Sequence, residues 1–322
     1  MRQVIERLSR DRPPGPAPSH RSAGTEPGGR RARVAAGLAD LERWLADQVR
    51  QGLPAADERD WSELARRLVD AQAPGMAAAV NRLGRLRAEG DWGALLDAYA
   101  LINLLAVGYR RRDDLPADLA RTVMMRVGFP VTRDEVLAGP ALRDLWDVLG
   151  RRDKEQDRLL SRRVWLRGRR TGRAALVLSF APVGQALDDS LVTGDTIDAE
   201  LVFYPGAAPV RALVATRHPD VPSGHPGDVA KTPPGVSARE ALEEVAVAVA
   251  GDPWTDSWPL VLTGVVPTAD QVGGLRWHRR FATPWELIAV SGGHPLTVAV
   301  EWTPRGLLPL ATWYDDGQVV PL

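Results

Sequence analysis

Residues 31–80 read RARVAAGLADLERWLADQVRQGLPAADERDWSELARRLVDAQAPGMAAAV, and the spacing of their apolar side chains decides the fold class of the first half of the chain. Apolar residues recur every three or four positions from the start of this stretch, at Val34, Leu38, Leu41, Leu45 and Val49. That period is typical of an amphipathic helix, and Gly52 is a suitable stop. A second helix is predicted to start at Asp60, with Glu63 completing a capping-box-like pattern. A third is predicted at Pro74, because proline suits the first helical turn.

The helical pattern continues beyond this stretch. A fourth helix is predicted to start at Asp91. Its broad apolar face is predicted to contain Trp92, Leu95, Leu96, Tyr99, Ile102 and Leu105. Gly128 is predicted to end a fifth helix, and Thr132 with Glu135 forms another capping box.

The end of the helical region is predicted near residue 160. The pattern favours a helix over residues 140–149 and allows one more over residues 153–161. The sequence therefore predicts a helical domain over residues 31–160. A flexible basic linker, rich in Pro and Gly, is predicted to precede it over residues 1–30.

The chain after Arg162 alternates apolar and polar residues instead. The segments VWLRG and AALVLSFA flank the turn GRRTG and predict a β-hairpin. The segment TIDAELVFYPG alternates as a half-buried strand does, and VRALVAT is predicted to pair with it. Further strands are predicted over residues 260–266, 275–279, 296–302 and 307–314, and helices over residues 237–250 and 284–291.

These patterns together predict an α+β fold. An N-terminal helical bundle is followed by an antiparallel β-rich domain, residues 161–322, with one or two helices. Regular βαβ alternation is missing from the sequence, which disfavours a Rossmann-type sheet.

Composition narrows the function classes. The chain has 322 residues, a formal net charge of 0 and 0 Cys. Without Cys it forms no disulfide and has no thiol nucleophile or thiolate zinc ligand. The N-terminal segment lacks the apolar core of a signal peptide, and no apolar run approaches the roughly 20 residues of a membrane span. We therefore expect a cytoplasmic protein with no membrane partner.

Charge is divided sharply along the chain. Residues 151–173 contain ten basic and three acidic residues, whereas residues 174–322 contain eight basic and seventeen acidic ones. The predicted hairpin carries the basic cluster: Arg162, Arg163, Arg167, Arg169, Arg170 and Arg173. Arginines at the tip of a β-ribbon can grip phosphates, so these six residues are the candidate nucleic-acid site. Alternatively, the cluster is a solvated tip or faces the acidic remainder of its own domain, and Trp165 belongs to the core.

Other candidate sites have weaker patterns. The segment GHPGDVAKT, residues 224–232, resembles a phosphate loop, but its spacing fits poorly and two prolines follow it. His218, Asp220, His225 and Asp228 are a possible set of metal ligands, although they lack the rigid spacing of a helix or hairpin site. No catalytic motif such as G-x-S-x-G or H-E-x-x-H is present. We therefore expect a non-enzymatic protein with no cofactor.

Several blocks resemble bacterial SWIM zinc-finger proteins, in the region that follows the finger. WSELARRLVDAQAPGMA resembles their most recognisable stretch. Later blocks follow in the family's order: ALRDLWDVLG, RRVWLRGRRTGRAALVLSFAPVG, DAELVFYPGAAPVRAL and VAVEWTPRGLLPLATW. The family's zinc ligands follow a Cys-x-Cys…Cys-x-His pattern upstream of these blocks. A chain without Cys cannot supply them, so zinc is expected only in a missing upstream finger. Natural loss of the finger, a misplaced start codon and a truncated gene are three explanations.

The resemblance also implies protein partners. Genes of this family often lie beside those of MoxR-type AAA+ ATPases and von Willebrand A proteins. The predicted function is therefore a non-enzymatic interaction or scaffold component of a bacterial multi-protein assembly. Two alternatives stay open: a nucleic-acid-binding accessory protein that uses the hairpin 162–173, and an uncharacterised ligand-binding or hydrolase domain in the β half.

Overall fold

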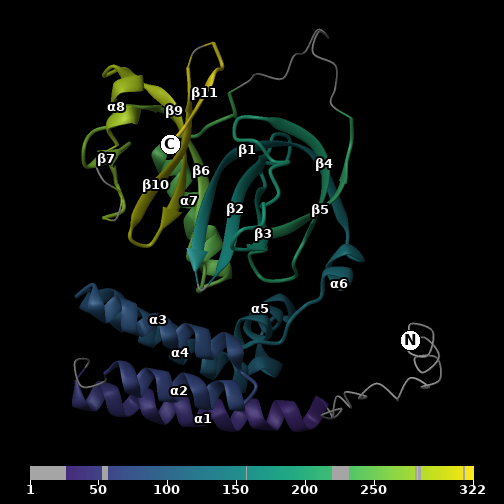
Figure 1. The fold of residues 1–322 in the computed structure, drawn as a ribbon, viewed down its shortest axis with the longest axis vertical. Helices are drawn as coiled ribbons and strands as arrows, with labels where there is room; N and C mark the ends of the chain where they lie inside the picture. Colours follow the sequence, from purple (N-terminus) through teal and green to yellow (C-terminus); the bar gives the residue numbers. More distant parts are fainter. Residues whose placement is uncertain are drawn as a thin grey trace, which may run out of the picture.

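A helical part lies at one end of the molecule, and a β-rich part lies at the other (Figure 1). The computed structural model describes residues 27–52, 57–156, 158–219, 232–279, 281, 284–314 and 316–322. Most of the predicted linker, residues 1–26, lies outside this set. The predicted α+β fold class is confirmed.

The helical part is a bundle with a continuous apolar core. Its helices are α1 (Pro27–Gln51), α2 (Glu58–Asp70), α3 (Pro74–Ala88), α4 (Trp92–Arg110) and α5 (Ala117–Val127), with a 3-10 turn, η2 (Arg112–Asp114), before α5. Fully buried side chains from four helices form the centre of this core, among them Leu41, Leu64, Met76 and Leu95. Gly75 is needed where α3 passes α5, because a Cβ there would meet the backbone oxygen of Arg126.

Most predicted helix ends are confirmed, and two are wrong. α3 starts at Pro74, α4 is capped by Asp91, and Gly128 follows α5. The second helix is capped by Asp57 instead of Asp60, since the Asp57 carboxylate accepts the first free backbone N–H groups. The first helix begins before residue 31, so the last residues of the predicted linker are helical.

The predicted helices over 140–149 and 153–161 are wrong. After the short helix α6 (Arg133–Leu137), which has the predicted capping box, the chain enters a 16-residue strand, β1 (Ala141–Gln156). Asp144 and Asp147 are both buried in this strand. Because charged residues occupy buried positions, the apolar–polar alternation that identifies a strand is hidden in the sequence. The helical part therefore ends at Leu137 instead of residue 160.

Five strands close into a barrel. They are β1, β2 (Leu159–Gly168), β3 (Ala174–Pro182), β4 (Thr196–Phe203) and β5 (Arg211–Arg217). The predicted hairpin is β2–β3, and β4 pairs antiparallel with β5 as expected. Around the barrel the order is β1-β2-β3-β5-β4, with β4 returning to β1 and β3 parallel to β5. This is the Greek-key order of the oligonucleotide/oligosaccharide-binding (OB) barrel.

The barrel interior is filled by side chains. Trp146, Val148, Leu166 and Leu201 are buried there. The Trp146 indole Nε1 donates to the backbone oxygen of Ala199 at 3.0 Å, which satisfies its buried N–H group. The barrel is therefore a packed core.

The C-terminal unit is a second sheet with helices beside it. Antiparallel strands follow the order β11-β10-β9-β6, formed by β6 (Trp258–Val265), β9 (Leu296–Thr303), β10 (Gly306–Trp313) and β11 (Val319–Pro321). The unit also contains α7 (Ala238–Gly251), α8 (Trp285–Ser291) and a short hairpin of β7 (Gln271–Val272) and β8 (Leu275–Arg276). Ser237 and Glu240 form the predicted capping box of α7.

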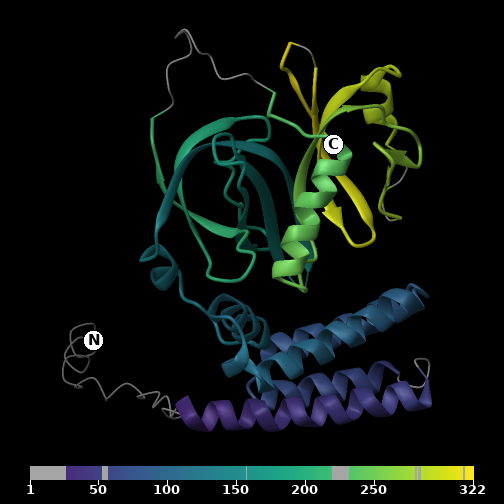
Figure 2. The ribbon, with the colours of Figure 1, turned by 180° about the vertical axis from the view of Figure 1, so that it is seen from behind.

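Both faces of this second sheet are covered. Leu260 and Leu262 of β6 share a core cluster with Val245 of α7, the light green helix in Figure 2. The intervening Val261 packs with Trp165 of the barrel, as the two-residue period of a strand requires. The sheet is thus held between α7 and the barrel.

A glycine allows a close approach of barrel and sheet. A Cβ at Gly150, on β1, would lie 2.7 Å from the Cβ of Leu310 on β10. The register of β1 also shifts between Val148 and Gly150, and such bulges bend a strand.

The helical bundle is attached through a few specific contacts. The Trp254 indole Nε1 donates to the backbone oxygen of Leu101 on α4 at 2.9 Å. Arg126 of α5 pairs with Asp252 at 2.9 Å. These residues connect the bundle to the segment that follows α7.

Candidate functional site

The six arginines of the candidate nucleic-acid site lie on β2 and on the turn before β3. Arg162, Arg163 and Arg167 are on the strand, while the other three are in the turn over residues 169–173. Strand alternation places Arg163, Trp165 and Arg167 on the outer face of the barrel. The neighbours of each guanidinium decide whether it can bind a ligand.

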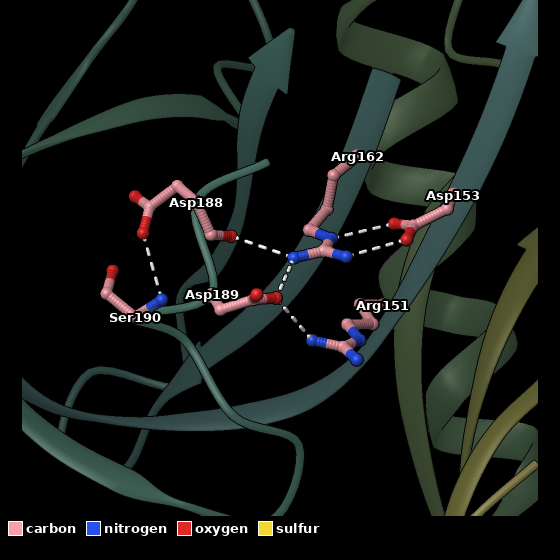
Figure 3. Close-up of polar contacts among 6 residues, drawn as sticks. All are labelled: Arg151, Asp153, Arg162, Asp188, Asp189 and Ser190. Atoms are coloured by element: carbon pink, nitrogen blue, oxygen red, sulfur yellow. Dashed lines mark hydrogen bonds and ion pairs between the residues drawn. The ribbon is translucent and has the colours of Figure 1, made fainter. Parts of the chain in front are cut away.

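Arg162 ties a loop to the barrel (Figure 3). Its Nε and Nη2 donate to the two oxygens of Asp153 at 2.8 and 2.7 Å, and its Nη1 donates to the backbone oxygen of Asp188 at 2.9 Å and to Asp189. These hydrogen bonds, those to Asp153 first, raise the pKa of Arg162, and they lower the pKa of Asp153. The side chain of Arg162 is only 8% exposed. It therefore anchors the β3–β4 connection.

Arg163 joins the barrel to the second sheet. Its Nη2 donates to Glu301 of β9 at 3.0 Å and to the Ser257 hydroxyl at 2.7 Å. Arg152 of β1 forms an ion pair with the same Glu301 at 3.2 Å. The Glu301 side chain is 6% exposed, and burial lowers the pKa of Arg152. One buried carboxylate is thus shared by two guanidinium groups from neighbouring strands.

Arg167 binds α7 in a bidentate pair. Its two terminal nitrogens donate to the Glu244 carboxylate at 2.9 and 2.7 Å. The Trp258 indole Nε1 donates to the same carboxylate at 2.8 Å. Glu244 therefore receives three hydrogen bonds and connects helix, barrel and second sheet.

Arg169 lies over a pair of buried carboxylates on β1. Its Nε donates to Asp147 at 2.8 Å, and the Thr196 hydroxyl donates to the same oxygen at 2.6 Å. Burial raises the pKa of Asp147 despite these contacts. The neighbouring Asp144 accepts the backbone N–H groups of Arg170 and Thr171 at 3.1 and 2.9 Å. Together the two carboxylates hold the β2–β3 turn.

Arg170 and Arg173 are the exposed members of the set. Arg170 donates to the backbone oxygen of Arg143, and the guanidinium of Arg173 lies 4.0 Å from the centre of the Phe203 ring. Neither forms an ion pair with a described residue. The two remain accessible to an anionic ligand, whereas the other four are bound to carboxylates within the chain.

The second sheet covers the surface through which OB barrels bind their ligands. That surface is the outer face of strands β2 and β3. Here Trp165 and Leu176 of this face are buried against Val261, Ala299 and Trp313 of the C-terminal unit. The predicted core role of Trp165 is confirmed. The acidic remainder of the domain thus lies against the basic hairpin. This is one of the alternatives to a nucleic-acid site that the sequence left open.

Of the remaining sequence candidates, the structure describes only His218 and Thr232. The His218 ring Nε2 lies 3.0 Å from Glu200. Asp220, His225 and Asp228 lie outside the described residues, as does nearly all of the phosphate-loop candidate 224–232. Among the residues that the structure describes, no group of three His, Cys, Asp or Glu side chains could hold a metal ion.

Helix α4 carries a surface that the sequence pattern placed in the core. Its buried face consists of Leu95, Tyr99, Ile102, Leu105, Ala106 and Tyr109. Trp92 and Leu96, predicted to join that face, are 44% and 50% exposed, and Leu101 and Leu104 are 37% and 43% exposed. Between residues 92 and 104 the exposed positions of α4 include only two polar residues, Asp97 and Asn103. We call Trp92, Leu96, Leu101 and Leu104 the α4 apolar face.

By length and composition, α4 is the one described helix that could cross a membrane. Its buried side chains instead form part of the bundle core. Core helices of soluble bundles meet the same criteria of length and composition, so this is not a clear membrane span.

The fold places the chain among proteins in which a helical bundle is joined to a barrel of OB topology. In this chain a second sheet covers the face that binds ligands in OB barrels. Residues 29–127 match the family model of the SWIM-associated four-helix bundle domain. This match covers the helices α1 to α5 and supports a SWIM-associated protein, as the sequence resemblance predicts. Neither a curated protein nor a solved structure shows a significant match to the chain.

Proposed function

We propose that the chain is a non-enzymatic interaction component of a cytoplasmic bacterial multi-protein assembly. The observation that carries this proposal is the α4 apolar face on the bundle that matches the SWIM-associated domain. Contiguous apolar surface on a soluble protein usually marks a place where another protein binds. A helix with large apolar side chains on its exposed face fits an apolar groove or a second helix of the partner.

The spacing of the α4 apolar face supports one continuous contact. Trp92, Leu96 and Leu104 are separated by multiples of four residues, and Ala100 fills the gap in this row. Side chains at such intervals form a ridge along the helix, which is the element that packs into the groove of another helix. Asp97 is the only charged residue along this part of the exposed face. Binding of a partner would therefore remove water from few charged groups of this chain.

The family resemblance suggests which partners to test. Genes of the SWIM family often lie beside genes of MoxR-type AAA+ ATPases and von Willebrand A proteins. We therefore take the products of such genes beside this one as the first partners to test.

The test is reconstitution of a complex from purified proteins. The chain is mixed with the neighbouring ATPase or von Willebrand A protein, and the mass of the complex is measured by size-exclusion chromatography with light scattering. Leu96→Asp combined with Leu104→Asp is expected to weaken the complex at least tenfold, because two charges would be buried at the contact. The matched control is Val247→Asp, since Val247 is 75% exposed on α7, which is not a helix of the bundle.

Two results would contradict this proposal. One is the failure of both partners to form a complex with the unaltered chain. The other is a complex that the α4 double variant and the α7 control weaken equally. Circular dichroism of each variant shows whether the bundle is still folded.

A second candidate function is nucleic-acid binding at the β2–β3 turn, which the exposed Arg170 and Arg173 favour, since the second sheet covers the usual ligand face of the OB barrel. The test is the fluorescence anisotropy of a labelled single-stranded oligonucleotide at increasing salt. Binding through these arginines should fall steeply with salt and should be lost when both are changed to Ala. Arg43→Ala on α1 is the control. Binding that survives the double change removes this candidate.

A further inference from the structure

A groove lies where the helical bundle meets the barrel. It has a volume of about 420 Å³ and is lined by residues of α1, η2, α5, the segment 129–131 and the β4–β5 loop. Its floor is apolar and contains Met124, Met125, Phe129 and Pro205. These four side chains are partly exposed, so the floor is open to a ligand.

Three arginines from three elements surround this floor. Arg31 comes from α1, Arg112 from η2 and Arg121 from α5, and Asp113 is the one acidic residue of the lining. The Arg31 side chain forms no hydrogen bond or ion pair with any residue that the structure describes. Among the described residues, Arg121 pairs with Asp118 at 3.2 Å and Arg112 pairs with Asp113 at 3.8 Å. The carboxylates of both pairs are exposed, and such contacts are weak. The rim therefore offers positive charge that the chain itself neutralises only in part.

Arg112 is fixed in place toward the groove. Its Nη1 donates to the backbone oxygen of Tyr109 at 3.0 Å, and its guanidinium lies 4.8 Å from the centre of the Tyr109 ring. Since these contacts already order the side chain, a ligand that binds it loses less conformational entropy.

The aromatic ring in the floor is not a platform for nucleobases. The Arg30 guanidinium lies 4.3 Å from the centre of the Phe129 ring, and Tyr109 stacks with Phe129 at a centroid distance of 6.1 Å. Base stacking requires a free aromatic face. The groove is therefore suited to insertion of apolar side chains rather than to a nucleic acid.

We propose that this groove binds a short acidic peptide segment of a partner protein, with a bulky apolar side chain of the peptide in the floor. Methionines adapt their shape to different apolar groups, which suits Met124 and Met125 to receive such an anchor. Carboxylates on either side of the anchor pair with Arg31, Arg112 and Arg121, for which arginine is well suited. The open shape and the spread of the three cations favour an extended chain over a small enclosed ligand.

This site is separate from the α4 apolar face, so the two proposals fail independently. The probe is the fluorescein-labelled peptide Glu-Asp-Glu-Leu-Phe-Glu-Asp-Glu, titrated with the full chain and followed by anisotropy. A saturable curve is expected with a dissociation constant on the order of 10 µM, and the affinity should decrease as salt is added. Arg31→Glu combined with Arg121→Glu should weaken binding about tenfold or more.

The controls distinguish the groove from general charge attraction. A peptide with Ser-Gly in place of Leu-Phe keeps the charge and should lose most of the affinity. Arg66→Glu changes another exposed arginine of the bundle and should leave the affinity within about twofold. The proposal is overturned if the Leu-Phe peptide does not bind, if the Ser-Gly peptide binds equally well, or if the two charge variants behave alike. Binding of a dT15 oligonucleotide that depends on Arg31 and Arg121 would also overturn it.

Discussion

In the helical bundle, most of the described arginine–carboxylate pairs join residues three positions apart, whereas in the β-rich part most of them join residues far apart along the chain. Arg43 and Asp40 on α1 are 77% and 55% exposed. Arg163 reaches Glu301, 138 residues away, and the Glu301 side chain is 6% exposed. Arginine and carboxylate side chains thus form exposed pairs on the surface of the bundle, whereas in the β-rich part they connect the barrel with the second sheet.

This difference shows which interactions determine the structure of each region. Exposed pairs on a helix contribute little, so the bundle depends on its apolar core and its helix caps. Buried pairs are costly to form, but removing one partner leaves an uncompensated charge. The ion pairs of the β-rich part therefore determine which face of the second sheet packs on the barrel. The apolar cluster around Trp165 contributes most of the free energy of that contact.

The largest effect is expected at the centre of the contact between barrel and second sheet. Trp165→Ala removes a fully buried indole, and it should lower the free energy of unfolding by about 3–5 kcal/mol. Urea unfolding followed by circular dichroism measures this loss. Trp285→Ala is the matched control, because Trp285 is 69% exposed, and its effect should stay within about 0.5 kcal/mol. Equal losses in the two variants would mean that the two units do not depend on this contact.

The next effect concerns the carboxylate that two arginines share. Glu301→Gln leaves Arg152 and Arg163 without a charged partner and should cost roughly 2–3 kcal/mol, somewhat less than for fully buried pairs because both arginines keep some solvent contact. Glu243→Gln changes an exposed α7 pair, 64% exposed on the carboxylate side, and should be nearly neutral. If the two variants unfold at the same urea concentration, the distinction between surface and connecting pairs is wrong.

The buried Asp147 should give the β-rich part a characteristic dependence on pH. Burial raises its pKa, so the folded protein holds the proton to higher pH than the unfolded chain. The free energy of unfolding should therefore fall as the pH rises from about 4, the ordinary pKa of Asp, through the raised pKa. Asp147→Asn should remove this fall, as urea titrations at several pH values would show.

Asp153 provides the control of opposite sign. Its hydrogen bonds from Arg162 lower its pKa, so its stabilising contribution is present above about pH 4 and is lost as the pH falls through the lowered pKa. Asp153→Asn should remove the pH dependence in that acidic range and lower the free energy of unfolding by a nearly constant amount above about pH 4. A pH profile of Asp147→Asn that runs parallel to the unaltered chain above pH 4 would refute the assignment.

The fold could be predicted from the sequence wherever the burial pattern is local. Helical spacing identified the bundle, and two-residue alternation identified β4, where Ile197, Ala199 and Leu201 are buried. β1 was missed because its buried positions include Asp144 and Asp147. Closure of the barrel depends on pairs such as Leu145 with Asp198, and no local pattern reports a contact over that distance.

The candidate site could be predicted only in part for the same reason. Local charge identified the hairpin arginines, and the acidic excess after residue 174 was a signal for partners in the same chain. The sequence could not say that Glu244 and Glu301 are those partners, because the contacts form only when the second sheet docks. Nor could it separate the two apolar faces of α4, since a buried and an exposed leucine look alike in sequence.

The smallest effect tests the other side of the comparison, a carboxylate of the bundle that acts locally. The Asp57 side chain accepts the backbone N–H groups of Arg59 and Asp60 at 2.8 and 3.1 Å. Asp57→Ala should therefore cost about 1 kcal/mol, the usual contribution of a helix N-cap. Glu63→Ala is the control, because the sequence pattern assigned it to the cap and the structure assigns it none. A larger loss for Glu63→Ala than for Asp57→Ala would restore the start of α2 to Asp60. The expected order instead gives this local carboxylate of the bundle an effect near 1 kcal/mol, below the effect of the long-range pairs that connect the barrel with the second sheet.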